Sequence, residues 1–163
     1  MMNYILKDIP VRTLKPRENG LTMVMDKGLS IREVENFLEV AGPYTDIVKL
    51  GWATSYVTPN LQDKLKVYQE AGIPTYFGGT LFEAFVMRNQ FDDYRRVLDK
   101  YGMKYAEVSD GSITIPHEQK CEYIRQLKEQ VTVISEVGSK DAEKILAPYK
   151  WIALMKAEIE AGA

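Results

Sequence analysis

The sequence contains one cysteine in 163 residues, so this chain cannot form a disulfide within itself. A chain of this kind is typical of a reducing compartment. No stretch reaches the roughly 20 consecutive apolar residues that a membrane-spanning helix needs, and residues 1–10 lack the apolar centre of a signal peptide. We therefore expect a cytoplasmic protein with no membrane partner.

An excess of charge of either sign is also missing. The chain has 21 basic and 23 acidic residues, which give a formal net charge of -2. Such a balance provides no strong field to attract nucleic acid, so we expect no nucleic-acid partner. The composition, with 45% hydrophobic and 27% charged residues, is that of an ordinary globular protein. The length suits a single domain over residues 1–163.

Histidine is as scarce as cysteine. His117 and Cys121 are four residues apart in a predicted helix, a spacing that could place both on one face as metal ligands. One such pair, without further His or Cys, is weak evidence for a metal site. We interpret the pair as a surface histidine in the first helical turn and a half-buried cysteine.

Five strand-helix units can be read along the chain. The expected strands are residues 21–25, 46–50, 74–77, 104–108 and 131–135, and the expected helices are 30–42, 58–72, 82–86, 91–101, a helix after Pro116, a short helix at 141–146, and 151–161. Strands that alternate with helices indicate parallel pairing through right-handed crossovers. The α/β pattern alone leaves two architectures open, a doubly wound sheet or part of an eight-fold barrel.

The expected strands are apolar runs that end in polar residues, in the phrases GLTMVMDKG, TDIVKLGWATS, KYAEVSDGS and VTVISEVGSK. In parallel α/β folds the residues at the carboxyl ends of the strands line the ligand site. The charged residues at these positions are Asp26, Lys27, Lys49, Asp110, Glu136 and Lys140. They predict a binding or catalytic site at this edge of the sheet.

Lys49 is the strongest of these candidates, because a lysine inside an apolar strand is costly unless its ammonium meets a partner or an anion. A structural ion pair remains the alternative. Asp110 belongs to SDGS and could be only a turn residue. Glu136 and Lys140 lie on either side of Gly138, as a metal ligand and an acid/base group would, although an ordinary solvated loop has the same pattern.

A further phrase, FGGTLFE, precedes or opens a predicted helix. The backbone N-H groups of Gly78, Gly79 and Thr80 could hold an anion there, since the start of a helix favours negative charge. A pair of glycines also serves plain turns. Glu83 could reach the same site or face solvent.

Taken together, these phrases resemble those of the phosphosulfolactate synthase family of coenzyme M biosynthesis. The matching stretches are KPRENGLTMVMDKG, DIVKLGWATS, FGGTLFE, VSDGS and SEVGSK, followed by MKAEIEAGA, and they occur in order over nearly the whole chain. The resemblance implies a (β/α)8 TIM barrel and a carbon-sulfur lyase. Its members add sulfite to phosphoenolpyruvate in a Mg2+-dependent reaction that gives (2R)-phospho-3-sulfolactate.

The resemblance also implies roles for particular residues. It makes Lys140 the candidate general acid and Lys49 and Lys27 candidates for binding the anionic substrates, phosphoenolpyruvate and sulfite. The candidate ligands of Mg2+ are Glu136, Asp110, Glu83 and Asp26.

Members of that family continue for about three more strand-helix units. We therefore expect about the first five units of a barrel, a truncated or incomplete chain that can be inactive alone. A sheet that does not close has open edges, which predicts homo-oligomers. The alternative to a synthase is a non-catalytic relative that acts as a binding or stress-related interaction protein.

Overall fold

The computed structural model describes residues 5–143 and 145–163 as a parallel α/β fold. Its strands are β1 (Met23–Asp26), β2 (Ile47–Leu50), β3 (Thr75–Phe77), β4 (Tyr105–Ser109) and β5 (Thr132–Glu136). Its helices are α1 (Ile31–Ala41), α2 (Thr54–Val57), α3 (Leu61–Glu70), α4 (Gly79–Val86), α5 (Phe91–Lys100), α6 (His117–Leu127) and α7 (Pro148–Ala161), with a 3-10 turn, η1 (Gly42–Tyr44), after α1. The five expected strands are confirmed, within two residues at each end.

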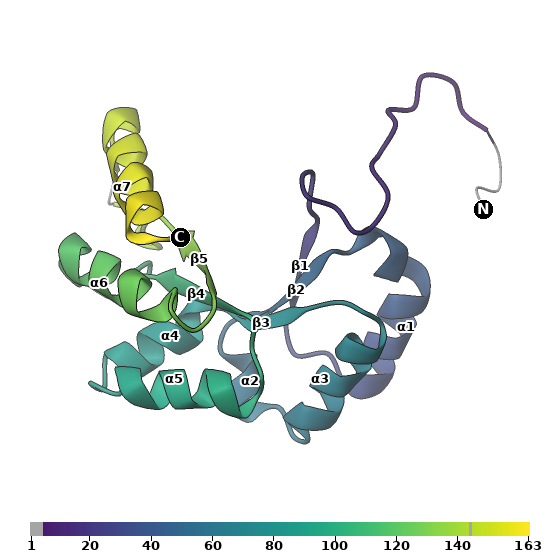
Figure 1. The fold of residues 1–163 in the computed structure, drawn as a ribbon, viewed down its shortest axis with the longest axis horizontal. Coiled ribbons are helices and arrows are strands. Elements are labelled where there is room, and N and C mark those ends of the chain that lie inside the picture. Colours follow the sequence, from purple (N-terminus) through teal and green to yellow (C-terminus); the bar gives the residue numbers. More distant parts are fainter. Residues whose placement is uncertain (1–4, 144) are drawn as a thin grey trace.

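The order of the strands decides between the two architectures. The sheet runs β1-β2-β3-β4-β5, and every neighbouring pair is parallel. A doubly wound sheet reverses its strand order at a switch point, whereas a barrel adds each strand beside the previous one. Figure 1 shows the helices around the outside of the curved sheet. The fold is that of the first five units of a (β/α)8 barrel.

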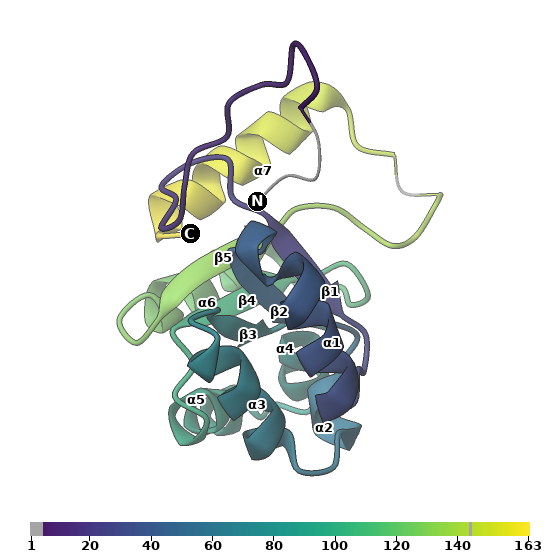
Figure 2. The ribbon, with the colours of Figure 1, turned by 90° about the vertical axis from the view of Figure 1, so that its right-hand side faces the viewer.

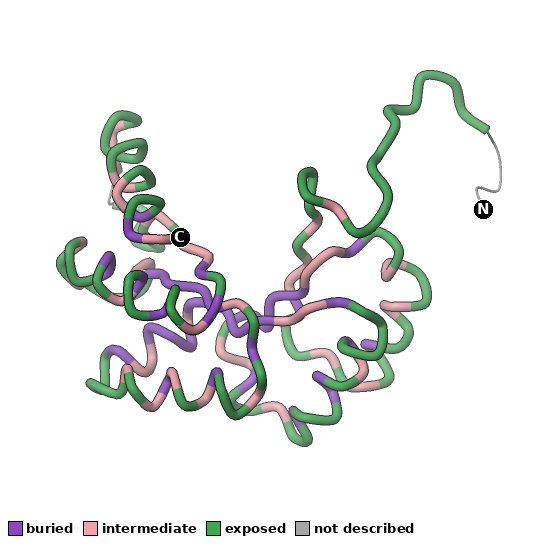
Figure 3. The backbone as a smooth tube through the Cα atoms, in the orientation of Figure 1, coloured by how far each residue is buried: buried purple, intermediate pink, exposed green. Residues whose placement is uncertain are grey.

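The two faces of the sheet differ in character. Leu50, Phe77 and Val108 face outward and belong to a core shared with the helices. Because side chains alternate along a strand, Lys49 and Glu107 point to the opposite, inner face. Figure 3 shows the buried positions along the central strands and the helix surfaces that meet them. Apolar packing therefore lies on the outer face, and the inner face is left for polar groups.

Helix α1 illustrates how the sequence sets the boundaries of a unit. Ser30 and Glu33 form the expected capping box, in which each side chain accepts a hydrogen bond from the other residue's backbone N-H. Val34 is the fully buried residue of this helix. Figure 2 shows α1 and α3 beside each other on the outer face. Their packing covers β1 and β2.

Two expected helices need correction. The helix expected at 58–72 is α3, but it begins later, at Leu61 after Asn60, whose φ is 52°; the short helix α2, which ends at Val57 before this range, was not predicted. Asn tolerates this left-handed conformation because its side chain can bond locally. The short helix expected at 141–146 is wrong for the residues that the structure describes, since 141–143 and 145–146 are turn or irregular.

Strands β1 and β5 are the edges of the described sheet. Self-association through these edges stays a prediction. None of the helices in residues 5–143 and 145–163 combines the length and the apolar character that crossing a membrane requires.

Candidate functional site

A buried lysine lies at the centre of the inner face, at the carboxyl end of the sheet. The Lys49 ammonium on β2 is 2.6 Å from Glu107 Oε1 on β4 and 3.3 Å from Glu136 Oε2 at the end of β5. Lys49 is 9% exposed and Glu107 3%, whereas half of the Glu136 side chain is exposed. The three residues form one cluster. We call its buried side, at Glu107, the sealed side, and its exposed side, at Glu136, the open side.

The charge of Lys49 is secured by its partners. Burial lowers the pKa of the Lys49 ammonium, but the hydrogen bond and charge of Glu107, together with the charge of Glu136, outweigh burial and raise this pKa above its usual value. The lysine is therefore a fixed cation at neutral pH. With two carboxylates on one ammonium, the cluster carries a net negative charge.

Glu107 is a member of this site that the sequence analysis missed. Tyr76 donates its hydroxyl to Glu107 Oε2 at 3.2 Å, and the backbone N-H of Gly79 donates to Oε1 at 2.7 Å. The available signal was its position inside the apolar run YAEVS, the same anomaly that drew attention to Lys49. Burial and the negative charge of Glu107 raise the pKa of the Tyr76 hydroxyl, which therefore stays protonated as a donor.

The two predicted anion-binding glycines are packed against the cluster. A Cβ on Gly78 would lie 2.8 Å from Lys49 Cε, and one on Gly79 would lie 2.2 Å from Ser109 Oγ. A Cβ at such distances would force these neighbours to move, and both are held by buried contacts. Because the Gly79 N-H is taken by Glu107, the described contacts give these glycines a packing role. Their predicted role in binding an anion stays a prediction.

Lys140 lies on the exposed side of the same edge. Its ammonium donates to Ser112 Oγ at 3.1 Å and to Thr80 Oγ1 at 3.4 Å, and its backbone N-H donates to Gly111 O at 2.8 Å. These contacts connect the loop after β5 with the loop after β4 and the start of α4. The structure thus brings Lys140 and Thr80 together, as the sequence analysis expected of site residues.

Glu83 on α4 is 2% exposed, so the alternative that it faces solvent is wrong. Ser109 Oγ donates to its Oε1 at 2.5 Å, and the backbone N-H of Ser112 donates to its Oε2 at 3.1 Å. Both carboxylate oxygens thus hold the start of the loop after β4. Glu83 therefore stabilises the loop after β4 through buried hydrogen bonds.

Asp110 also lies at this edge, with a quarter of its side chain exposed. The buried ammonium of Lys120, on α6, donates to Asp110 Oδ1 at 2.9 Å and to the backbone oxygen of Glu136 at 2.7 Å. The ends of β4 and β5 are therefore connected through one side chain. Lys120 was absent from the sequence-based candidates.

Lys27 and Asp26 do not join the cluster. The Lys27 ammonium lies over the ring of Trp52, 4.7 Å from its centroid. Asp26 points to the outer face, where its oxygens are bound by Lys64 and Tyr68 of α3 and by backbone N-H groups of its own loop. The role of Asp26 as a metal ligand stays a prediction, with both oxygens already occupied by protein donors.

The residues of the open side suit magnesium by their chemistry. Mg2+ usually binds one or two carboxylates and completes its shell with water and substrate oxygens. Glu136 and Asp110, both partly exposed, provide such carboxylates. Over residues 5–143 and 145–163, no group of three His, Cys, Asp or Glu side chains is assembled as a metal site. The role of Glu136 and Asp110 as Mg2+ ligands stays a prediction.

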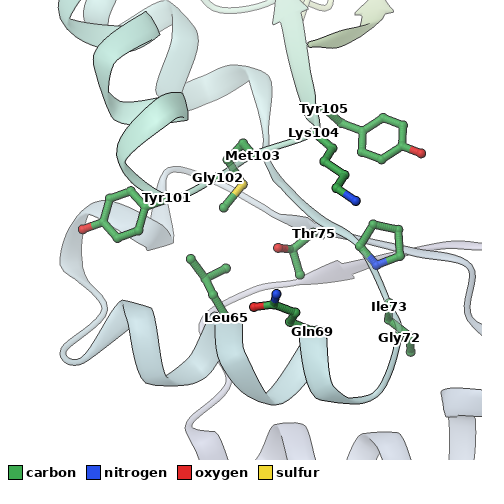
Figure 4. A pocket seen from close by; sticks show the side chains of 11 residues that line it. Leu65, Gln69, Gly72, Ile73, Thr75, Tyr101, Gly102, Met103, Lys104 and Tyr105 are labelled. Atoms are coloured by element: carbon green, nitrogen blue, oxygen red, sulfur yellow. The ribbon is translucent and has the colours of Figure 1, made fainter. Parts of the chain in front are cut away.

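A cavity of about 460 Å³ lies at the other end of the strands (Figure 4). It is lined by Leu65 and Gln69 of α3, by Thr75 at the start of β3, and by Met103 and Lys104 before β4. In barrels the amino-terminal ends of the strands serve stability, and the chemistry lies at the carboxyl ends. The cluster around Lys49 is therefore the better candidate for the functional site.

His117 and Cys121 show no metal geometry of their own. His117 Nε2 lies 3.1 Å from Glu158 Oε1, and the Cys121 sulfur is 3.9 Å from His117 Nδ1. Cys121 is 2% exposed and belongs to the core, so it is buried and not half-buried. Burial raises the pKa of its thiol, which keeps the group neutral.

Residues 10–163 match the model of the family described as (2R)-phospho-3-sulfolactate synthase (ComA). The chain is 36% identical to a phosphosulfolactate synthase of Bacillus subtilis, over 99% of this chain and 65% of the relative. It is 39% identical to the synthase of Methanocaldococcus jannaschii, over 90% of this chain and 60% of the relative. A synthase of Methanothermobacter thermautotrophicus is 35% identical, over 94% and 62%. The chain thus spans 60–65% of the length of these relatives. It belongs to the phosphosulfolactate synthase family.

Proposed function

We propose that the carboxyl edge of this sheet forms part of the active site of a Mg2+-dependent phosphosulfolactate synthase, an enzyme that adds sulfite to phosphoenolpyruvate. Three named relatives support the reaction class. The observation that carries the proposal is the 3.3 Å contact between Lys49 and the half-exposed Glu136, with Lys140 at the same edge. A cation and a carboxylate therefore meet at the edge where a barrel places its chemistry, and a second amine lies at the same edge.

In the proposed reaction the sulfur lone pair of sulfite attacks the methylene carbon of phosphoenolpyruvate and forms a C-S bond. The electrons of the C=C bond move into the substrate carboxylate. A proton then adds to the carbon that bears the phosphate ester, and no group leaves. The site has to stabilise the extra charge on the carboxylate and deliver one proton.

Lys140 is the proposed proton donor. Its exposed ammonium is held by Ser112 and Thr80 and lies at the open side of the cluster, where a substrate can approach. Lys49 is a candidate for binding the anionic groups of the substrates, although its ammonium is paired with Glu107 and Glu136 in this structure. Lys27, over Trp52 at the same edge, is a second candidate for this attraction.

Mg2+, when bound by Glu136 and Asp110, would supply positive charge opposite the substrate carboxylate. One feature of the Glu136 carboxylate suits this role. Glu136 contacts Lys49 by one oxygen, and its other carboxylate oxygen accepts no hydrogen bond from the described residues. Two negative carboxylates on one ammonium leave charge for a metal ion to neutralise.

The proposal is tested by following sulfite-dependent consumption of phosphoenolpyruvate with Mg2+, and by detecting the phosphosulfonate product with phosphorus NMR. We expect product from a chain of the length of the relatives. A version of the 163-residue chain is assayed beside it to learn whether the described units are sufficient. The Lys140→Met variant is expected to lower kcat by about 100-fold or more, the usual contribution of a general acid.

A non-catalytic binding role is the other outcome of the same test. It would be supported if phosphoenolpyruvate with Mg2+ raised the melting temperature of both chains while neither formed product. Absence of both product and stabilisation in both chains would reject the proposed function.

A further inference from the structure

We infer that Lys120 is a positioning residue, which holds the two loops of the site in register from beneath the sheet edge. The inference rests on the proposed function in one respect: these loops carry the proposed Mg2+ ligands and proton donor. The contacts of Lys120 themselves are independent of that function.

Lys120 joins three separate elements at one point. Its ammonium donates to Asp110 Oδ1 at the end of β4 and to the backbone oxygen of Glu136 at the end of β5, and it forms an ion pair with Glu158 of α7 at 2.8 Å. An ammonium has three donors and no acceptor; two of them are used by the hydrogen bonds to Asp110 and Glu136, and Glu158 adds a close opposite charge. Among the residues that the structure describes, no other side chain makes polar contacts with both of these strand ends and with α7.

Burial makes this arrangement rigid. Lys120 is 1% exposed and Glu158 0%, so neither charge can turn to water. Glu158 Oε1 faces both Lys120 and His117, and its Oε2 is buried without a hydrogen-bond partner among the described residues. A buried carboxylate with one unsatisfied oxygen is costly unless it pairs with a cation. Glu158 therefore compensates the charge of Lys120 and keeps it in place.

Lys120 does not occupy all of the carboxylate oxygens at the ends of β4 and β5. It uses one oxygen of Asp110 and only the backbone of Glu136, so the Glu136 carboxylate and the second Asp110 oxygen remain for other partners. The loop after β5 then leads to Lys140, whose backbone N-H is bound by Gly111, next to Asp110. The loops after β4 and β5 are thus connected twice, by Lys120 and by the hydrogen bond between Lys140 and Gly111.

Lys64 provides a matched control. It is also 1% exposed and also pairs with a buried carboxylate, Asp26, at 2.7 Å, but on the outer face beneath β1. Lys120→Met and Lys64→Met each leave a buried carboxylate without its cation, and both are expected to lower the melting temperature by about 10 °C. Only Lys120→Met removes the connection between the two site loops.

The test is a comparison of amide NMR spectra of the 163-residue chain. In Lys120→Met we expect the amides of residues 110–112 and 136–140 to shift or broaden, and in Lys64→Met we expect those amides to keep their wild-type positions. Glu158→Gln, which leaves the bonds of Lys120 to Asp110 and Glu136 possible, should disturb α7 more than the loops. Unchanged loop amides in a folded Lys120→Met variant would overturn the inference.

A measurement on the wild-type protein applies even if Lys120→Met does not fold. A buried ammonium with two hydrogen bonds and an ion pair exchanges its protons slowly, so the Lys120 side-chain signal should be visible by NMR and exchange at least about 10-fold more slowly than that of Lys66, which is 70% exposed. Exchange as fast as that of Lys66 would reject the positioning role. Addition of Mg2+ and phosphoenolpyruvate separates the two proposals, because the proposed function fails if no wild-type amide shifts, whereas the Lys120 result does not depend on these ligands.

Discussion

Two lysine clusters lie on opposite faces of the sheet. Each pairs a buried lysine with a carboxylate that also accepts a tyrosine hydroxyl, but only one of them includes an exposed carboxylate. On the outer face Lys64 pairs with Asp26, which also accepts the Tyr68 hydroxyl at 2.9 Å. On the inner face Lys49 pairs with Glu107, which accepts the Tyr76 hydroxyl. The inner cluster alone has a further, half-exposed carboxylate, Glu136.

The difference separates a structural cluster from one that can bind. Asp26 Oδ1 accepts the backbone N-H groups of Gly28 and Leu29, each at 2.8 Å, and its Oδ2 serves Lys64 and Tyr68. Its capacity is used up, so it contributes stability. The inner cluster keeps an open carboxylate at the edge of the sheet, so it can exchange a partner for a ligand.

The largest expected effect comes from opening the sealed cluster. Asp26→Asn leaves the Lys64 ammonium buried without a counter-charge, which should lower the free energy of unfolding by about 3–5 kcal/mol. Urea unfolding followed by circular dichroism measures the change. Glu70→Gln, which breaks an exposed pair with Lys66, is the control and should cost less than about 1 kcal/mol. Equal losses in the two variants would contradict the contrast drawn between buried and exposed pairs.

Acid should weaken the same cluster. Burial raises the pKa of the Asp26 carboxyl, but the Lys64 ammonium and the two loop N-H groups together lower it below its usual value. A carboxyl with a lowered folded pKa adds stability above its unfolded pKa, about 3.9, and loses it as the pH falls through the folded pKa. We expect the free energy of unfolding to decrease as the pH is lowered below about 4. In Asp26→Asn this decline should be shallower, and an unchanged slope would exclude Asp26 as its cause.

Smaller losses are expected from the two tyrosines, which test the clusters against each other. Tyr68→Phe and Tyr76→Phe each delete one buried hydroxyl that donates to a carboxylate, at a cost of about 1.5–3 kcal/mol. Their functional effects should differ, because only Tyr76 holds the partner of Lys49. We expect Tyr76→Phe to weaken stabilisation by phosphoenolpyruvate with Mg2+ in a thermal melt. Tyr68→Phe should leave that stabilisation unchanged, and a matching loss there would undo the assignment of roles.

The sequence predicts the units of the fold well because the core follows local pattern. Apolar runs become the strands, and the Ser30–Glu33 capping box begins α1 where it was expected. Lys49 stands out because a charge inside such a run demands a partner. The same reasoning applies to Glu107, which lies inside the apolar run YAEVS and therefore outside the pattern of charges at strand ends.

The contacts that distinguish the two clusters depend on the register between strands, which the sequence does not show. Asp26 and Lys49 both lie near strand ends, yet Asp26 is paired with Leu50 and therefore faces the helices. A shift of one residue would turn it to the inner face. Lys120 and Glu158 were missed for a related reason, since they meet through the packing of α6 on α7.

The smallest change in stability is expected at the open side of the inner cluster. Glu136→Gln alters a half-exposed carboxylate, and Lys49 keeps Glu107 at 2.6 Å, so the free energy of unfolding should change by less than about 0.5 kcal/mol. The Mg2+ concentration at which phosphoenolpyruvate stabilises the protein should nevertheless rise by about 10-fold or more. Loss of a residue that only supports a metal ligand already weakens metal binding by this factor, and Glu136 is itself a proposed ligand. Glu107→Gln is the matched variant at the sealed side, and it should be less stable because the Gly79 N-H, Tyr76 and Lys49 all depend on that carboxylate. If Glu136→Gln were instead the less stable of the two, the open carboxylate would be structural and the distinction between the two faces of the sheet would fail.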